Sequence, residues 1–154
     1  MKILKFGGSS VKTTERIEQV VKLISSKNPC GVVVSAFGGI TDQLIQLIAY
    51  AERGADYNND LQLFFDRHRK TIHDLHIEKE LLFNTLQEIE IELSITLSTI
   101  ANQKKCTPQL KDAALSVGER LSANIITEAC IDKGINAAYL DARKVILTDD
   151  HFGS

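Results

Sequence analysis

A short apolar strand that runs directly into two glycines constrains the start of this chain. Residues 2–6 carry two lysines among apolar side chains, and Gly7, Gly8 and two serines follow before a helical pattern begins. Such a junction of strand, glycine-rich loop and helix presents backbone N–H groups and a helix N-terminus, which together attract phosphate. Lys5 adds a positive charge beside the loop. The opening therefore indicates phosphoryl chemistry.

The segment that follows predicts a βαβ unit. Thr13 or Thr14 can cap a helix, which Pro29 ends. Residues 31–35 are then a strand-like run centred on three β-branched valines, as expected for a parallel strand covered on both faces. A strand, a helix and a second parallel strand form a right-handed unit. One buried stripe of the helix is predicted at i, i+3, i+4 and i+7, namely Ile17, Val20, Val21 and Ile24.

A second glycine loop follows the second strand. Ser35 and Thr41 bracket Gly38 and Gly39 at the carboxyl end of that strand. In open parallel sheets this edge is where ligands bind. Thr41 has a competing role as the N-cap of the next helix, whose apolar period ends near Gly54.

The middle of the chain predicts a long helical hairpin. Residues 59–103 contain neither glycine nor proline and keep a helical period, with a break near residues 76–78. His68 falls on an apolar stripe and is expected in the core. His73 and His76 have a spacing that can bind metal, but no Cys or carboxylate completes a set, so no metal site is predicted.

Beyond the hairpin, the pattern returns to a helix and then to strands. A turn near Pro108 leads into one or two further helices before Gly134, a plausible C-cap. A third strand is expected at residues 137–141 and a shorter fourth at residues 145–148. The pattern therefore predicts an α/β fold.

Bulk properties exclude several classes of protein. The 154 residues fit one domain, and a net charge of −2 gives no basic footprint for nucleic acid or an anionic membrane. The apolar runs are too short for a membrane span, and no signal peptide is recognised. Three widely spaced cysteines predict reduced thiols in a cytoplasmic protein rather than a disulfide framework or a zinc site.

Two established nucleotide motifs are absent from the sequence. There is no G-x-x-x-x-G-K-[ST], so a P-loop enzyme is excluded. There is no G-x-G-x-x-G, and the second strand ends in Ser35 rather than an acidic residue, which disfavours a dinucleotide-binding domain.

Four short motifs are spread along the chain. They are KFGGSSV at residues 5–11, VSAFGGITD at residues 34–42, SVGERLS at residues 116–122, and residues 141–153, which begin DARK and end in FG. Together and in this order they resemble the aspartokinases, within the amino acid kinase superfamily.

The resemblance implies a fold and an activity. The fold would be the N-terminal part of a three-layer α/β/α sandwich with a mostly parallel sheet, plus a helical hairpin at about residues 55–105. The activity would be ATP-dependent phosphorylation of the side-chain carboxylate of L-aspartate, with Mg²⁺, as the first step toward lysine, threonine and methionine. Residues 1–154 would then be a fragment lacking the C-terminal nucleotide-binding half and inactive alone. Its incomplete sheet predicts a homo-oligomer.

The resemblance also assigns roles to residues. Glu119 would bind the substrate ammonium, although a glutamate in the first turn of a helix is the alternative interpretation. Arg120 is expected to be structural or at the rim, and Asp141, Arg143, Thr148 and Asp149 are not assigned to catalysis. The implied set comprises Lys5 for catalysis, Gly7, Gly8 and Ser9 for phosphate, and Ser35, Ala36, Thr41 and Glu119 for the substrate.

Two other functions stay open at this point. Another member of the superfamily would phosphorylate a different carboxylate, a carbamate or a nucleotide. A non-catalytic fragment that dimerises through the hairpin is a hypothesis of a different class.

Overall fold

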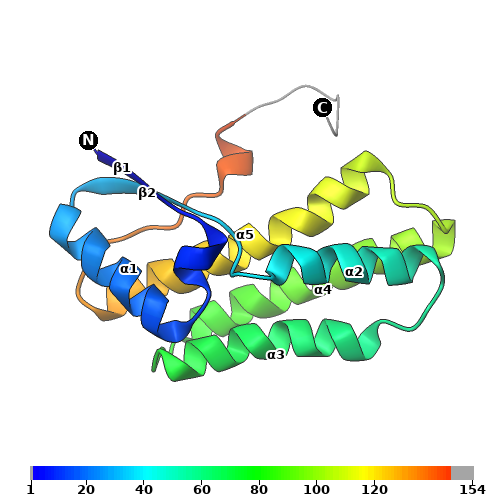
Figure 1. Cartoon of the computed structure of the whole chain (residues 1–154), viewed down its shortest axis with the longest axis horizontal. Helices are drawn as coiled ribbons and strands as arrows, with labels where there is room; N and C mark the ends of the chain where they lie inside the picture. Colours follow the sequence, from blue (N-terminus) through cyan, green and yellow to red (C-terminus); the bar gives the residue numbers. More distant parts are fainter. Residues whose placement is uncertain (1, 147–154) are drawn as a thin grey trace.

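The computed structural model describes residues 2–146, which form a small parallel sheet beside a bundle of helices (Figure 1). Strands β1 (Lys2–Phe6) and β2 (Cys30–Val34) pair in parallel, with Lys2 opposite Cys30 and Phe6 opposite Val34. Helix α1 (Thr14–Lys27) connects them and contacts both. The predicted βαβ unit is confirmed.

Five helices of more than ten residues account for most of the described chain. The four that follow β2 lie side by side as a bundle, with the sheet and α1 at one end (Figure 1). Helix α2 contacts the other three, and α5 continues beneath the sheet to contact α1 and β2. The four helices are α2 (Ile40–Glu52), α3 (Asn58–Asp74), α4 (Glu80–Gln103) and α5 (Pro108–Asp132).

The predicted helical hairpin is confirmed as α3 and α4. Its break at residues 75–79 includes His76, whose positive φ of 57° turns the chain between the helices. His68 is fully buried, as expected for a core histidine. The residues of both predicted stripes are buried: Leu61, Phe65, Ile72, Leu75, Leu82, Leu86, Ile89, Leu93 and Ile100.

Local capping explains where two of the helices begin. The hydroxyl of Thr13 accepts from the amide of Arg16 at the start of α1, which resolves the choice between two adjacent threonines. Thr107 caps α5 in the same way, with Pro108 at the first helical position. A single helix therefore fills the region where one or two were expected.

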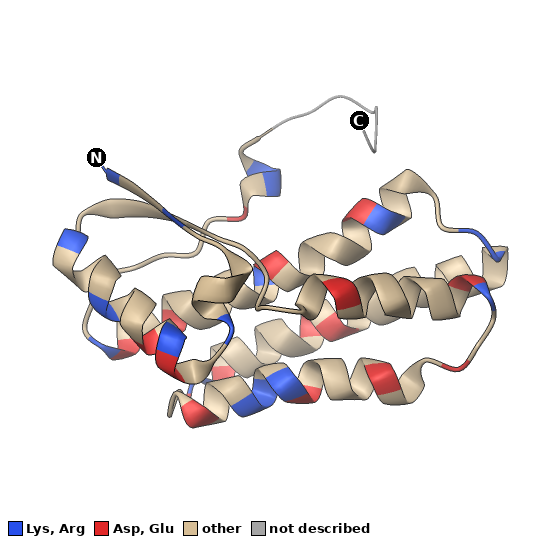
Figure 2. Ribbon diagram, in the orientation of Figure 1, with Lys and Arg blue, Asp and Glu red and all other residues tan. Residues whose placement is uncertain are grey.

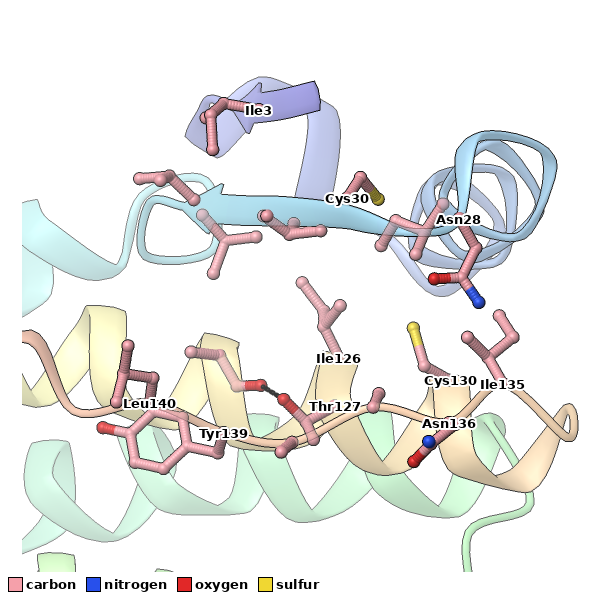
Figure 3. Close-up of a pocket in the computed structure, with 18 residues that line it drawn as sticks. Ile3, Asn28, Cys30, Ile126, Thr127, Cys130, Ile135, Asn136, Tyr139 and Leu140 are labelled. Carbon is pink, nitrogen blue, oxygen red and sulfur yellow. Dashed lines mark hydrogen bonds between the residues drawn. The ribbon is translucent and has the colours of Figure 1, made fainter. Parts of the chain in front are cut away.

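The expected third strand is wrong. Residues 137–141 form neither helix nor strand, and η2 (Ala142–Lys144) is a 3₁₀ turn. The physical reason is separation: residues 137–140 face β2 across a pocket of about 480 Å³ and do not form a ladder with it (Figure 3). The expected fourth strand lies partly outside the described residues, and its described part, residues 145–146, is not a strand.

The second strand is less covered than its β-branched run predicts. Val32 and Val33 are 37% and 54% exposed, and Ile3 on β1 is 62% exposed. Among the long helices, α1 and α5 make the main contacts with the described sheet. Residues 2–146 are therefore mostly helical with a two-stranded sheet, and coverage of both faces is not seen within them.

Charged residues of both signs are interspersed along the helices (Figure 2). Among residues 2–146, none of the helices combines the length and the apolar character needed to cross a bilayer.

Candidate active site

The two glycine loops lie against each other at the carboxyl ends of β1 and β2. The amide of Ser35 donates to the carbonyl of Phe6 at 3.0 Å, which extends the strand pairing to the mouth of both loops. A Cβ on Gly8 would stand 3.0 Å from the carbonyl oxygen of Ala36 and 3.6 Å from Cα of Gly38. Glycine at position 8 is therefore what lets the two backbones approach.

Helix α5 reaches the second loop through adjacent residues. A Cβ on Gly118 would lie 2.8 Å from Cβ of Ala36 and 3.0 Å from Cγ2 of Ile40, so the absence of a side chain sets the spacing of α5 from the loop. Oε1 of Glu119 accepts a long hydrogen bond, 3.4 Å, from the amide of Ala36. The structure thus brings together two residues that are 83 positions apart.

The position of Glu119 corrects one expectation. It was expected at the opening of a helix, yet α5 begins at Pro108 and ends at Asp132, so Glu119 is in its middle. A mid-helix carboxylate does not neutralise the helix dipole, which acts within the first turn. The alternative interpretation of Glu119 is therefore wrong.

Thr41 is not the N-cap of α2, which was the alternative role for this residue. The N-cap of α2 is Gly39, whose φ of 85° is in the left-handed region that favours glycine, and Thr41 is the second residue of the helix. The Thr41 side chain is exposed near the end of the loop. Its contact with a substrate stays a prediction.

Lys5 and Ser9 flank the first loop. Lys5 is exposed near the end of β1, with Nζ 4.0 Å from the point where a Cβ on Gly7 would stand. Ser9 is exposed in the 3₁₀ turn η1 (Gly8–Val11), and its carbonyl accepts from the guanidinium of Arg16. Val11 is fully buried and fixes this turn to the core.

Sequence reasoning missed two residues of α3 that contact the second loop. Nη2 of Arg67 donates to the carbonyl of Gly38 at 2.7 Å. The ring of His68 stacks on Phe37, with centroids 5.4 Å apart and an interplanar angle of 18°. The helical periodicity predicts that His68 is buried in the core, but it does not predict that His68 contacts the second loop.

An ion-pair network lies beside Glu119. Arg120 pairs with Glu92 of α4 at 2.7 Å, which agrees with its expected structural role. Arg143 pairs with Asp141 at 2.7 Å and lies 3.6 Å from Glu92. Hydrogen bonds from Arg143 lower the pKa of Asp141 to about 2, and the Arg120 guanidinium lowers the pKa of Glu92. The network therefore stays charged at neutral pH and ties the chain after α5 to the bundle.

Two pockets adjoin this part of the molecule. One, of about 430 Å³, is lined by Ser116, Glu119 and Arg120 together with β2 and residues 139–143. The other, of about 480 Å³, has walls from β2, α5 and residues 135–140 and contains no candidate site residue (Figure 3). We take the pocket with Glu119 as part of the candidate site, because only it contains a predicted substrate residue.

Within residues 2–146, no group of three His, Cys, Asp or Glu side chains is placed to hold a metal ion. His73 is mostly exposed and contacts Asp74. Thr148 and Asp149 lie outside the described residues.

Comparison with known proteins identifies the family. The sequence model of the amino acid kinase family matches residues 1–152. The chain therefore belongs to this family. The chain is 31% identical to an aspartokinase of Chlamydia pneumoniae over 97% of its own length. It is also 31% identical to the chloroplastic aspartokinase 1 of Arabidopsis thaliana over 96% of its length.

Solved structures agree on the fold. Aspartokinase III of Escherichia coli, in complex with lysine and aspartate, superposes with a TM-score of 0.80 at 25% identity, over 99% of this chain and 34% of that one. The same enzyme with aspartate and ADP also gives 0.80, at 22% identity. The predicted amino acid kinase fold is therefore confirmed. The chain spans 32% and 27% of the lengths of the two relatives named above.

Proposed function

We propose that this chain supplies the phosphate-binding and aspartate-binding loops of an ATP-dependent aspartate kinase. The observation that carries the proposal is the contact of Glu119 with the amide of Ala36, directly beside the apposed glycine loops. A carboxylate suited to an ammonium group and a loop suited to phosphate then lie at one edge of the sheet. Similarity to aspartokinases supports L-aspartate as the acceptor.

The chemistry requires positioning more than covalent catalysis. The side-chain carboxylate of L-aspartate, already ionised at neutral pH, attacks the γ-phosphorus of ATP in line. A new O–P bond forms as the bond to the β,γ-bridging oxygen breaks, which gives 4-phospho-L-aspartate and ADP. No general base is needed.

Each predicted residue has a role in this reaction. The Lys5 ammonium offsets charge on the transferring phosphoryl group, and the Gly7 and Gly8 amides approach it without a side chain between, with Ser9 as a further donor. Ser35, Ala36 and Thr41 hold the amino acid, with Glu119 on its ammonium.

Mg²⁺ is assigned no protein ligands here. The described residues offer no cluster for it, and Mg²⁺ is commonly held by substrate phosphates and water with only one or two carboxylates. The ion would accompany ATP, and no step above depends on a residue that binds it.

The setting of the activity follows from the same proposal. A phosphorylated aspartate would serve the biosynthesis of lysine, threonine and methionine. The three cysteines are free, with two of them half-buried and Cys130 buried, which suits the cytoplasm. Self-association also stays a prediction, and light scattering at increasing concentration tests it; a monomer throughout would contradict it.

The test is an amide NMR titration of the chain with L-aspartate, with L-glutamate as the control ligand. We expect selective shifts at Ser35, Thr41 and Glu119. A second titration with Mg²⁺ and a non-hydrolysable ATP analogue, which carries the γ-phosphate, should shift Gly7 and Gly8. Lys5→Ala should weaken this binding, whereas Lys2→Ala on the same strand should not. Equal response to L-glutamate, or to carbamate in a panel of acceptors, would point to another member of the family. A dispersed spectrum that responds to no acceptor would contradict the proposal.

A further inference from the structure

We infer that Arg67 is a positioning residue that holds the second glycine loop, residues 36–39, in the shape that receives the amino acid. The inference rests on the proposed function and adds a residue from α3, which carries none of the four sequence motifs. Arg67 does not touch the substrate in this view; it acts through Gly38.

The contact is direct and specific. Nη2 of Arg67 lies 2.7 Å from the carbonyl oxygen of Gly38, a charge-assisted hydrogen bond. Nη1 lies 3.8 Å from the point where a Cβ on Gly39 would stand, so the guanidinium covers both glycines. Among residues 2–146, no carboxylate lies within 4.0 Å of Arg67, whereas Arg69 on the same helix pairs with Asp66 and Glu90.

Gly38 is held on two sides. A Cβ on Gly38 would meet Cγ of Lys12 at 2.9 Å and the carbonyl of Gly8 at 3.1 Å, so the first loop packs on one face of this residue. Arg67 binds its carbonyl. Helix α3 is therefore connected through Gly38 to the loop predicted to bind phosphate as well as to the loop predicted to bind aspartate.

The next residue of α3 anchors the same loop from inside. His68 is fully buried, and its ring stacks on Phe37, which is 2% exposed. Nδ1 of His68 lies 2.8 Å from the carbonyl of Phe64, so this nitrogen is the donor. Consecutive residues of one helix thus fix consecutive residues of the loop.

The position of the loop explains why this matters for binding. Five residues join the end of β2 and the start of α2, and one of them is Gly39, a glycine in the left-handed region whose backbone can adopt several other orientations. The Arg67 hydrogen bond selects one orientation of the Gly38 carbonyl. Without it, we expect the peptide after Gly38 to rotate and the flanking groups, the Ala36 amide and Thr41, to lose their mutual placement.

The test compares three variants of the full 154-residue chain in an L-aspartate titration. Arg67→Met keeps the aliphatic stem but removes the donor, and we expect the dissociation constant for L-aspartate to rise roughly tenfold. Arg67→Lys restores a cationic donor and should recover most of the affinity. Arg69→Met removes a guanidinium from the same helix without touching the loop, and should change the affinity less than twofold.

Two results would overturn the inference. One is unchanged affinity in Arg67→Met; the other is an equal loss in Arg69→Met, which would indicate a general effect on α3. The melting temperature of Arg67→Met should stay within a few degrees of the wild type. A purely structural role of Arg67 would instead lower the melting temperature, and Arg67→Lys would not restore it.

A separate readout keeps the inference distinct from the proposed function. If the wild-type chain does not bind L-aspartate, the proposed acceptor fails, but the amide resonances of Gly38 and Gly39 still report the loop. They should move or broaden in Arg67→Met and not in Arg69→Met. If the Gly38 and Gly39 amide resonances were the same in Arg67→Met as in Arg69→Met, the role of Arg67 would be overturned, whatever the acceptor is.

Discussion

Oε1 of Glu119 lies 3.4 Å from the backbone nitrogen of Ala36, and this contact joins the middle of α5 to the second glycine loop. Gly118, the preceding residue, has no side chain to keep the helix and the loop apart. The contact places a carboxylate beside a loop that precedes the N-terminus of α2. In the proposed function, the ammonium group of the bound amino acid pairs with Glu119.

Removal of the Glu119 charge should weaken aspartate binding. In Glu119→Gln the amide oxygen can still accept from Ala36, so the fold should be retained while the ion pair with the substrate ammonium is lost. We expect the dissociation constant to rise by at least about tenfold, because hydrogen bonds to charged groups contribute about 1.5–3 kcal/mol. Glu128→Gln, on the same helix, is the control; a similar loss there would rule out a specific role for Glu119. Calorimetric titration measures both.

Addition of one methyl group at position 118 should destabilise the chain and disturb the loop. The new Cβ of Gly118→Ala would stand 2.8 Å from Cβ of Ala36, within a packed contact between helix and loop. Overpacking of this kind costs about 1–3 kcal/mol. Gly31→Ala is the control, because its new Cβ comes close to the end of the exposed Ile3 side chain, which can move aside, and otherwise makes an ordinary 4.0 Å contact with the carbonyl of Lys2. Urea denaturation should separate the two variants, and equal stability would contradict the close approach.

His68 should make the chain less stable in mild acid. Burial lowers the pKa of His68 from 6.5 to about 4. Above pH 6.5 neither state is protonated at this residue, and between 6.5 and 4 only the unfolded chain binds the proton. The free energy of unfolding therefore falls as the pH drops through this window, by roughly 3 kcal/mol in all, and levels off below it.

The measurement is the difference between the wild type and His68→Leu in urea denaturation at pH 7, 5.5 and 4.5. Subtraction cancels the titration of carboxylates common to both proteins. The stability of the wild type should fall more steeply than that of the variant. His73→Leu, at an exposed site, should keep the steep dependence. Parallel curves for the wild type and His68→Leu would contradict the prediction.

The two adjacent threonines before α1 should differ in their effect on stability. The Thr13 hydroxyl accepts from the amide of Arg16 at 3.4 Å, whereas Thr14 is already the first residue of the helix. Loss of an N-cap costs about 0.5–2 kcal/mol. Since this hydrogen bond is long, we expect Thr13→Ala to fall at the lower end of that range and Thr14→Ala to have a smaller effect. A thermal denaturation series compares them, and the reverse order would place the cap at Thr14.

Expectations that depend on neighbours in sequence were largely right. The βαβ unit, the start of α1 and the hairpin of α3 and α4 follow from periodicity, capping and the absence of glycine and proline. The expected strand at residues 137–141 was wrong, because a strand exists only where a partner is within hydrogen-bonding reach. Residues 137–140 meet β2 across a pocket instead.

The sequence by itself determined the two glycine loops, the apolar stripes and the types of side chain available for phosphoryl chemistry, because these depend on local backbone preference and short spacing. Only the tertiary structure decided that Glu119 lies mid-helix against Ala36 and that Arg67 binds Gly38. Those contacts join residues 83 and 29 positions apart, and their formation depends on how the helices of the bundle pack around a common core. No local pattern encodes a distance of that kind.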